Sequence, residues 1–276
     1  MDRILTVEQM TFCEHETEKY GVSLAQLMDN AAAQLAEVIA SNSSSSSKIV
    51  LLIGKGNNGG DGLVAANLLA EQGLKPAVVL CCGEPDTDLS SAAYARLDKS
   101  VEVLKAENAL DFIEGADVLV DCIFGTGFHG EPSPAISRII DKINGSGKFV
   151  ISADINSGLD SDSGLFSKCV CSSLTVSVGT YKYGHFLGSA KDVIKTKRNI
   201  DIGIDIRGDF ALLVGKDDVL PLLSHRKNNS NKGNYGYVGI MGGCTEYSGA
   251  VKLSNLALSA LRAGAGVSRL IIPESI

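Results

Sequence analysis

Residues 49–62 have the sequence IVLLIGKGNNGGDG, an apolar run of five residues followed by five glycines among the next nine. The run is apolar at every position, which predicts a strand at 49–53 that is buried on both faces. A helix is expected near 62–72. Glycines let backbone N–H groups approach a ligand, and a helix N-terminus carries partial positive charge. The segment therefore suits a phosphate or pyrophosphate, and the alternative is a tight strand-to-helix turn that binds no ligand.

Part of this segment matches GxGxxG, a pattern of dinucleotide-binding folds, at Gly54, Gly56 and Gly59. Such folds usually carry an acidic residue roughly 20 residues further on, at the end of the second strand, and Glu84 is the candidate here. An NAD-dependent dehydrogenase is therefore one alternative. It predicts hydride transfer to a second substrate and no requirement for potassium.

Four more short apolar runs follow, separated by stretches with helical spacing. Because these runs are continuous rather than alternating, the strands need cover on both faces, which favours a mostly parallel sheet with right-handed crossovers. The predicted fold class is α/β, a doubly wound Rossmann-like three-layer αβα sandwich. The expected strands are 77–82, 118–122, 149–153 and 174–178, and further helices are expected near 89–99 and 134–144.

Two helices are expected before the first strand. Each begins with a capping-box pattern, Thr6 with Gln9 and Ser23 with Gln26, in which the two side chains satisfy each other's free backbone N–H groups. Apolar residues recur at helical spacing through the second helix, so we expect that face to pack on the sheet. A serine run at 43–47 is expected to form a loop before the first strand.

The composition excludes several function classes. The chain has 276 residues and a net charge of −7, which argues against a nucleic-acid partner because polyanion binders need a concentrated basic surface. No apolar run approaches the ~20 residues of a membrane span. The first ten residues, MDRILTVEQM, carry charges where a signal peptide would be apolar. We therefore expect no membrane association and a cytoplasmic location.

Polar segments follow two other predicted strands. Asp121 leads into GTGFHGE at 125–131, and Asp154 leads into INSGLD at 155–160. Ligands of open α/β sheets lie beyond the carboxyl ends of the strands, so these segments and the glycine-rich one are expected to converge on one crevice. Either aspartate alone is better explained as a cap or a loop hydrogen-bonding group. Together, Asn58, Asp121 and Ser157 offer oxygen ligands that suit an alkali or alkaline-earth ion.

A further polar segment, SVGTYKYGH at 177–185, follows the fifth predicted strand. Lys182 is a candidate catalytic or phosphate-binding amine, and a surface lysine is the ordinary alternative. His185 is a weaker candidate, because a lone histidine is more often structural. Basic residues after this segment most simply form a solvated face: Lys191, Lys195, Lys197 and Arg198.

A polar stretch at 225–232, HRKNNSNK, marks a boundary. Beyond it, residues 237–241 predict a strand and 251–262 a helix. The remaining stretch of about 40 residues is too short for an independent core, since domains need roughly 50 or more. We therefore expect a complete domain at 1–215, a linker at 216–236 and the incomplete start of a second domain at 237–276.

Four motifs together resemble the NAD(P)H-hydrate epimerase family: 54–62, Asp121 followed by GTGF at 125–128, 154–160 and 182–184. Because several motifs agree, the resemblance is specific, and it covers roughly residues 1–215. The segments 232–238, 242–250 and 261–266 are similar to the beginning of a ribokinase-like NAD(P)H-hydrate dehydratase, which follows the epimerase in bifunctional repair enzymes. The resemblance thus implies an incomplete ribokinase-like fragment at the C-terminus, without dehydratase activity of its own.

The resemblance implies an isomerase that interconverts the R and S forms of hydrated NADH or NADPH, so that an S-specific dehydratase can act on both. It implies one potassium ion per subunit, held by Asn58, Asp121 and Ser157. It is compatible with a homodimer and with a functional partnership with a complete dehydratase. The implied substrate-binding residues are Asn57, Asn58, Gly59, Gly60, Asp61, Gly125, Thr126, Gly127, Phe128, His129, Gly130, Glu131 and Asp154.

The catalytic hypothesis concerns Asp154 and Lys182. Inversion at a carbon that bears a hydroxyl and a ring nitrogen can proceed by ring opening and reclosure, or by loss and re-addition of the hydroxyl through an iminium. Both routes need a proton donor and acceptor beside that carbon, and we assign this role to Asp154 with Lys182 assisting. Asn156 and Tyr181 stand where the family commonly has proline. Besides the dehydrogenase, a catalytically inactive nucleotide-binding protein is the other alternative.

Overall fold

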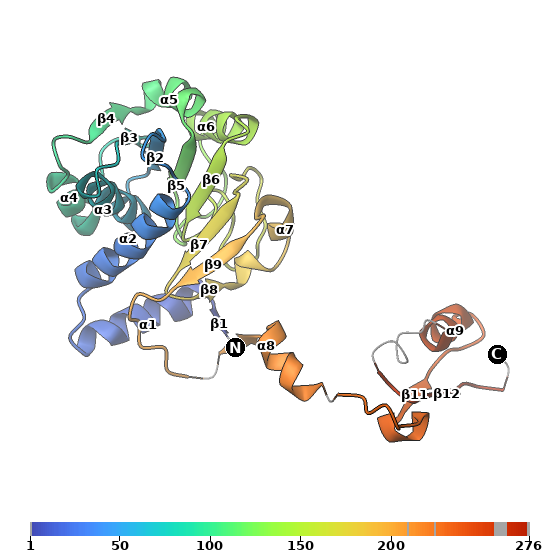
Figure 1. Ribbon diagram of the computed structural model, residues 1–276. Coiled ribbons are helices and arrows are strands. Elements are labelled where there is room, and N and C mark those ends of the chain that lie inside the picture. The colour runs from blue at the N-terminus through green and yellow to red at the C-terminus, as the bar shows by residue number, and fades with distance from the viewer. Residues whose placement is uncertain (1, 209, 224, 257–263, 275–276) are drawn as a thin grey trace. The chain divides into compact units, whose positions relative to one another are not determined.

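The computed structural model describes residues 2–208, 210–223, 225–256 and 264–274. The chain divides into two compact units, Met1–Val214 and Gly215–Ile276. Among the described residues of the first unit, seven parallel strands form one sheet in the order β4-β3-β2-β5-β6-β7-β9 (Figure 1). Their bounds are β2 Ile49–Ile53, β3 Pro76–Leu80, β4 Glu102–Lys105, β5 Val118–Cys122, β6 Phe149–Ala153, β7 Leu174–Val178 and β9 Lys197–Ile200.

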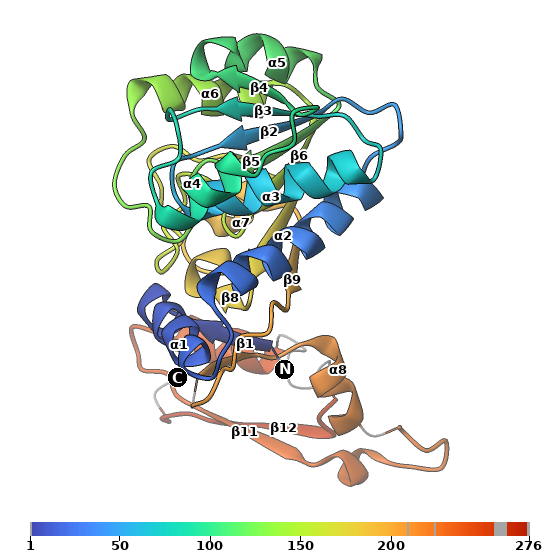
Figure 2. The same cartoon turned by 90° about the vertical axis from the view of Figure 1, so that its left-hand side faces the viewer.

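Helices cover both faces of this sheet (Figure 2). Alternate side chains of β2 enter different cores: Leu51 packs in the cluster that contains α2, α3 and α4, whereas Leu52 packs in the one that contains α5 and α6. The predicted three-layer αβα, Rossmann-like sandwich is therefore confirmed for the first unit. The helices are α2 Leu24–Ser41, α3 Asn57–Glu71, α4 Asp88–Ala95, α5 Ala109–Gly115 and α6 Pro134–Gly145.

The strand order determines where a ligand can bind. The chain runs from β2 outward to β3 and β4 on one side and then returns to β5 on the other side of β2. The helix after β2 packs on one face of the sheet and the helix after β5 on the other. The two connections therefore diverge and leave a crevice at the carboxyl ends of these strands.

The five expected strands of the sheet are present, and the two that the sequence pattern did not predict lie at its edges. Both β4 and β9 carry charged residues and are largely exposed or half-buried. They therefore lack the continuous apolar run that marks a central strand. Lys197 and Arg198 lie in the edge strand β9, half-buried and exposed respectively, in agreement with the expected solvated face.

A second sheet of the described residues, also not predicted, joins three short strands in the order β10-β1-β8. Leu5 of β1 pairs with Lys182 of β8. Because α1 follows β1 directly, this pairing brings the first helix next to the segment around Lys182. The bounds are β1 Asp2–Leu5, α1 Val7–Lys19, β8 Tyr181–Lys182 and β10 Ala211–Leu213.

The two N-terminal helices begin where the caps predicted. In α1 the capping box is complete, since Gln9 N donates to Thr6 Oγ1 and Thr6 N donates to Gln9 Oε1. In α2 only half of it forms: Gln26 N donates to Ser23 Oγ, but Gln26 Nε2 donates to Asn30 Oδ1. The prediction of a second capping box is therefore wrong, because the Gln26 amide has a competing partner one turn further on.

In the second unit, β11 (Tyr237–Met241) and β12 (Val267–Ile271) pair in parallel, with α9 (Ser248–Leu256) between them in the chain. The first of these strands was predicted and the second was not. The expected helix at 251–262 begins three residues earlier, and residues 257–262 lie outside the described part. The expected linker includes a short helix, α8 (Lys216–Val219). Within the described residues, no helix is both long enough and apolar enough to cross a membrane.

Candidate active site

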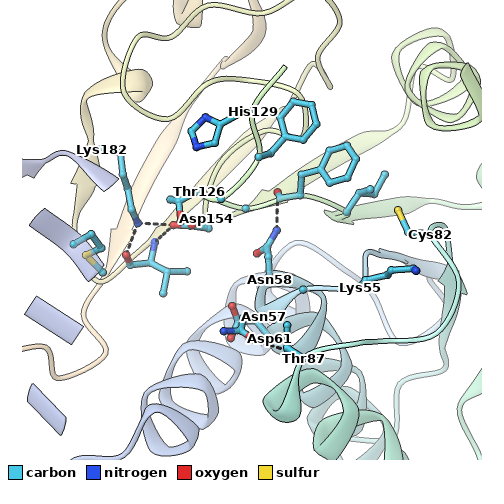
Figure 3. Close-up of a pocket in the computed structure, with 18 of the residues that line it drawn as sticks. Lys55, Asn57, Asn58, Asp61, Cys82, Thr87, Thr126, His129, Asp154 and Lys182 are labelled. Carbon is cyan, nitrogen blue, oxygen red and sulfur yellow. Dashed lines mark hydrogen bonds and ion pairs between the residues drawn. The ribbon is translucent and has the colours of Figure 1, made fainter. Parts of the chain in front are cut away.

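A cavity of about 630 Å³ lies in the first unit (Figure 3). Its lining comes from α1 and from the segments that follow β2, β3, β5, β6 and β7. The polar segments that the sequence predicted to converge therefore share one cavity, at the carboxyl ends of the central strands. Glu84, the acid on which a dehydrogenase would depend, does not line it.

The glycine-rich segment is more helical than expected. Helix α3 begins at Asn57, five residues before the predicted start, so Asn57, Asn58 and Asp61 lie in its first turns and line the cavity. A Cβ on Gly59 would lie 2.2 Å from the carbonyl oxygen of Gly54, and one on Gly60 would lie 2.6 Å from a methionine side chain. Gly59 and Gly60 therefore permit close packing of the protein on itself and do not line the cavity.

The most buried polar contact of the cavity joins Lys182 and Asp154. Lys182 Nζ donates to Asp154 Oδ1 over 2.5 Å and to the carbonyl oxygen of Val178 over 2.8 Å. The Lys182 side chain is 1% exposed and that of Asp154 is 13% exposed. An ammonium group has three protons, so one remains for a ligand. Figure 3 shows this pair on one side of the cavity.

The backbone of Asp154 is held in an unusual conformation. Its φ is +61°, in the left-handed region that non-glycine residues seldom adopt. Its N–H donates to the carbonyl oxygen of Val176, in the middle of β7. The chain therefore turns sharply after β6, and this turn directs the carboxylate toward Lys182.

Two other carboxyl groups share the cavity with Asp154. Burial raises the pKa of Asp61 well above its usual value, and the negative charges of Asp154 and Glu14 add to this effect. Burial also raises the pKa of Glu14; the positive charge of Lys182 opposes that shift, and Asp154 adds to it. At these two positions the cavity therefore disfavours the charged form of the carboxyl group compared with water.

Glu14 was missed by the sequence analysis, because nothing in the sequence near it suggests a site. Met10 and Glu14 are one helical turn apart on α1 and both line the cavity. They reach it because the pairing of β1 with β8 places α1 there, and that pairing was not predicted.

The three predicted metal ligands are linked through the backbone of Phe124. Asn58 Nδ2 donates to the carbonyl oxygen of Phe124 over 2.9 Å, and the N–H of Phe124 donates to Ser157 Oγ over 2.8 Å. Ser157 Oγ and Ser157 N donate to the two carboxylate oxygens of Asp121. Asp121 and Ser157 are fully buried behind the cavity wall, whereas Asn58 lines it.

The side-chain oxygens of this network differ in the number of hydrogen bonds that they accept. Asp121 also accepts from Ser152 Oγ and from the N–H of Ile123, so each of its oxygens has two donors. Burial raises its pKa, and the hydrogen bonds from Ser157 and Ser152 oppose this. By contrast, Asn58 Oδ1 is buried and has no hydrogen-bond partner among the described residues.

The segment after β5 forms another wall. Gly125, Thr126, Gly127, Phe128 and His129 line the cavity, whereas Gly130 and Glu131 do not. The ring of Phe128 stacks on that of Phe124 with centroids 4.3 Å apart. His129 Nδ1 lies 3.3 Å from Asp160 Oδ2, which connects this wall to the segment after β6.

Several lining residues on the β3 side were also not predicted. Thr87 Oγ1 donates to Asn57 Oδ1 over 2.6 Å, and Thr87 is the N-cap of α4. Lys55 has a largely exposed side chain whose Nζ lies 3.8 Å from Asp86. Cys82 completes this part of the lining. The cap pattern at Thr87 was a usable signal in the sequence, whereas the place of Lys55 and Cys82 depends on the fold.

Comparison with known proteins gives a family and several relatives. Residues 24–184 match the family described as YjeF-related protein N-terminus. The chain is 34% identical, over 99% of its length, to the bifunctional NAD(P)H-hydrate repair enzyme Nnr of Thermofilum pendens, and 33% identical, over 100% of its length, to that of Hyperthermus butylicus. These matches cover 54% and 52% of the two proteins, so the chain spans about half the length of the curated relatives it matches.

A solved structure supports the fold independently. The crystal structure of the yeast protein YNL200c superposes with a TM-score of 0.63 and covers 75% of this chain and 96% of its own. The sequences are 21% identical, so this likeness concerns the fold.

Proposed function

The chain belongs to the YjeF-related protein N-terminus family, and from this we propose that it is an NAD(P)H-hydrate epimerase, an isomerase that interconverts the R and S forms of hydrated NADH or NADPH. The two relatives named above are NAD(P)H-hydrate repair enzymes. The observation that carries the proposal is the buried pair of Lys182 and Asp154 in a cavity large enough for a nucleotide.

Substrate binding is assigned to the two walls that meet at the crevice. No described side chain caps the N-terminus of α3, whose first N–H groups have no partner within the helix, and Lys55 lies beside it. These groups suit the pyrophosphate of a dinucleotide. Residues Gly125 to His129 form the opposite wall. The damaged nicotinamide ring then lies toward Asp154 and Lys182.

The reaction requires one proton to be given and one to be taken at the carbon that carries the hydroxyl. In the iminium route, protonation of the hydroxyl lets the C–O bond break and water leave. Water then adds to the other face of the ring and loses a proton. Asp154 gives the first proton to the hydroxyl and takes the second from the adding water, while Lys182 holds the carboxyl group in place and keeps a third N–H for the substrate. In the ring-opening route the same pair takes the proton of the hydroxyl and gives one to the ring nitrogen as the C–N bond breaks, and reclosure on the other face reverses both transfers.

We further propose that Asn58, Asp121 and Ser157 hold one potassium ion per subunit. The buried, unpartnered Asn58 Oδ1 fits a cation, and the donor set consists of oxygens only, which suits a hard ion. When bound, the ion would supply positive charge next to the dinucleotide. Asp121, already held by four donors, would contribute mainly its charge.

The assignment of activities to segments of the chain is also a proposal. Residues 1–215 are assigned to the epimerase, 216–236 to a linker and 237–276 to the start of a dehydratase domain. In the described residues after 236, two strands and one helix are present, which cannot form a kinase-like nucleotide site. We therefore expect these 276 residues alone to lack nucleotide-dependent dehydratase activity. A cytoplasmic location, a homodimer and a working partnership with a complete dehydratase complete the proposal.

The proposal is tested by supplying the pure R-hydrate of NADH or NADPH to the full chain. Appearance of the S form is followed with a separate S-specific dehydratase, with and without potassium. Epimerisation should occur, and Asp154→Asn should lower its rate by ~10²–10⁴-fold, because asparagine keeps the size and tolerates the left-handed backbone but cannot exchange the proton.

Three outcomes contradict the proposal. A wild-type rate in Asp154→Asn removes this residue from the chemistry. Binding of the hydrate without turnover by the unmodified chain indicates an inactive nucleotide-binding protein. Hydride transfer from NADH to a second substrate indicates a dehydrogenase.

A further inference from the structure

His185 connects the two residues of the catalytic pair. It ends the short 3-10 helix Tyr183–His185, directly after β8, and is fully buried. Its Nδ1 accepts a hydrogen bond from the backbone N–H of Lys182 over 3.0 Å, and its Nε2 lies 2.8 Å from the carbonyl oxygen of Asp154. The imidazole thus joins the backbones of two residues that are 28 positions apart in the chain.

These contacts specify one form of the imidazole. With the proton on Nε2, the ring donates to the carbonyl of Asp154 and accepts from the N–H of Lys182, so both contacts are satisfied. With the proton on Nδ1, the ring could donate only to the carbonyl of Lys182, 3.2 Å away, and the Nε2 lone pair would face the carbonyl oxygen of Asp154. The neutral Nε2–H form is therefore the one that fits.

The charged form is excluded by the same surroundings. An imidazolium would set an Nδ1–H against the N–H of Lys182, next to the Lys182 ammonium. Burial, and then the charge of Lys182, lower the pKa of His185 to about 4, although Asp154 acts in the opposite direction. Among the described residues, Tyr181 also faces the ring, edge-on and with the ring centroids 5.7 Å apart.

The carbonyl of Asp154 belongs to the residue with the unusual backbone. Among the described residues, Asp154 is the only non-glycine residue with positive φ. On one side its N–H is held by β7, and on the other its carbonyl is held by His185. Together these two bonds fix the peptide planes on both sides of Cα, and hence the direction in which the carboxylate points.

We propose that His185 is a positioning residue for the epimerase: by donating from Nε2 to the carbonyl of Asp154, it holds the left-handed backbone that aims the Asp154 carboxylate at Lys182 and the substrate. The catalytic part of this assignment rests on the proposed function. The structural part, one imidazole tautomer that holds one backbone conformation, does not.

Two substitutions by amide side chains test the two hydrogen bonds of His185 one at a time, because each keeps one bond and removes the other. The Nε2 of glutamine is as many bonds from Cβ as the Nε2 of histidine, so His185→Gln can still donate to Asp154. The Oδ1 of asparagine corresponds to Nδ1, so His185→Asn can accept from Lys182 but does not reach Asp154. Both variants lose volume and one hydrogen bond. We therefore expect them to lose similar thermal stability, and a purely structural role would affect their activities equally.

We expect the two variants to differ in kcat. His185→Asn should lower kcat by ~10²-fold, as for a reacting group displaced by about 1 Å, with little change in KM. His185→Gln should lower it much less. Crystal structures of the variants should retain positive φ at Asp154 in His185→Gln and lose it in His185→Asn. Equal losses of kcat in the two variants, or a fully active His185→Asn, would overturn the proposal.

A second measurement does not depend on activity. Long-range ¹H–¹⁵N NMR spectra of the wild-type chain should show, at neutral pH, one histidine with a bare Nδ1 and a protonated Nε2, and this signal should be absent from His185→Gln. A protonated Nδ1 would contradict the proposal. If the wild-type chain fails to epimerise the hydrate, the proposed function fails, while the tautomer and the φ of Asp154 still decide the structural part.

Discussion

Asp61 illustrates how a single ionisable residue of the cavity can lower the free energy of unfolding. It lies in the second turn of α3, close enough to Asp154 and Glu14 for their charges to raise its pKa further above the value that burial alone produces. A folded-state pKa above the unfolded value means that the folded chain binds the proton more tightly. Ionisation at neutral pH therefore costs folding free energy.

We predict that Asp61→Asn stabilises the protein at pH 7, on the order of 1 kcal/mol, because it removes a half-buried carboxyl group whose charged form is disfavoured by its surroundings and by Asp154 and Glu14. The gain should shrink as the pH falls through the folded-state pKa of Asp61 toward its usual value near 3.8, since the wild-type carboxyl is then protonated. Urea unfolding at several pH values measures this.

The exposed Asp98 provides a control of opposite sign. Hydrogen bonds from Ser100 lower the pKa of Asp98. Asp98→Asn should therefore bring no gain at pH 7, and any loss it causes should vanish as the pH falls below the usual value. A pH-independent gain in Asp61→Asn would show that charge is not the cause.

At the scale of elements, α3 can pack closely on the end of β2 because Gly59 has no side chain at the point of contact. Gly59 lies inside a helix, where alanine is normally the better residue by ~1 kcal/mol. Here, however, an added Cβ would lie 2.2 Å from the carbonyl oxygen of Gly54 and 3.2 Å from a side-chain atom of Ile53. Both of these neighbours lie in or directly after β2, which the rest of the sheet holds in place.

Gly59→Ala is therefore expected to destabilise the protein by about 1–3 kcal/mol or more, as overpacking does, despite the higher helix propensity of alanine. Gly56→Ala is the matched control, because nothing lies within 4 Å of its added Cβ and its φ is −81°. Chemical unfolding of both variants checks this. Equal stability of the two would mean that α3 shifts away from β2 without cost.

At the scale of the whole chain, the first unit should be autonomous. It ends at Val214, directly after β10, which pairs with β1 near the N-terminus. The small core under that sheet includes Leu5 and Met10 from the N-terminal part and the half-buried Phe210 from the C-terminal part. The last strand of the unit, β10, therefore holds β1 in place, and β1 leads directly into α1, the helix that carries Glu14 to the cavity.

A chain that stops after Val214 should unfold cooperatively and keep the proposed epimerase activity. One that stops after Arg207 lacks β10 and Phe210 and should lose stability and activity together. Circular dichroism with heating, and the S-specific dehydratase assay, measure the two effects. An inactive 1–214 chain that remains fully folded would show that the second unit contributes to the reaction.

The net charge of the whole chain does not favour binding of an anion. The net charge of −7 and the carboxyl groups of the cavity give no general attraction for an anionic dinucleotide. For the proposed substrate, attraction must come from local groups: the N-terminus of α3, Lys55, Lys182 and the proposed potassium ion. Binding through so few positive groups should depend weakly on ionic strength compared with polyanion binding.

The order of residues alone is enough to specify the five inner strands of the sheet, the class of fold and most of the polar segments of the cavity. Strands 49–53 and 118–122 are apolar at almost every position, and the segments after them are glycine-rich, so local pattern and topology agree. The edge strands β4 and β9, and the sheet that contains β1, could not be predicted, because they are short and their residues are partly charged.

The tertiary structure alone decides which distant groups meet. Glu14 reaches the cavity only through the pairing of β1 with β8, and His185 reaches Asp154 only because the chain returns to the same crevice after β7. The unusual φ of Asp154 is likewise set by its partners on β7 and at His185. Local sequence expresses periodicity and backbone preference, which depend on near neighbours, whereas hydrogen bonds and shifted pKa values depend on groups that only folding brings together.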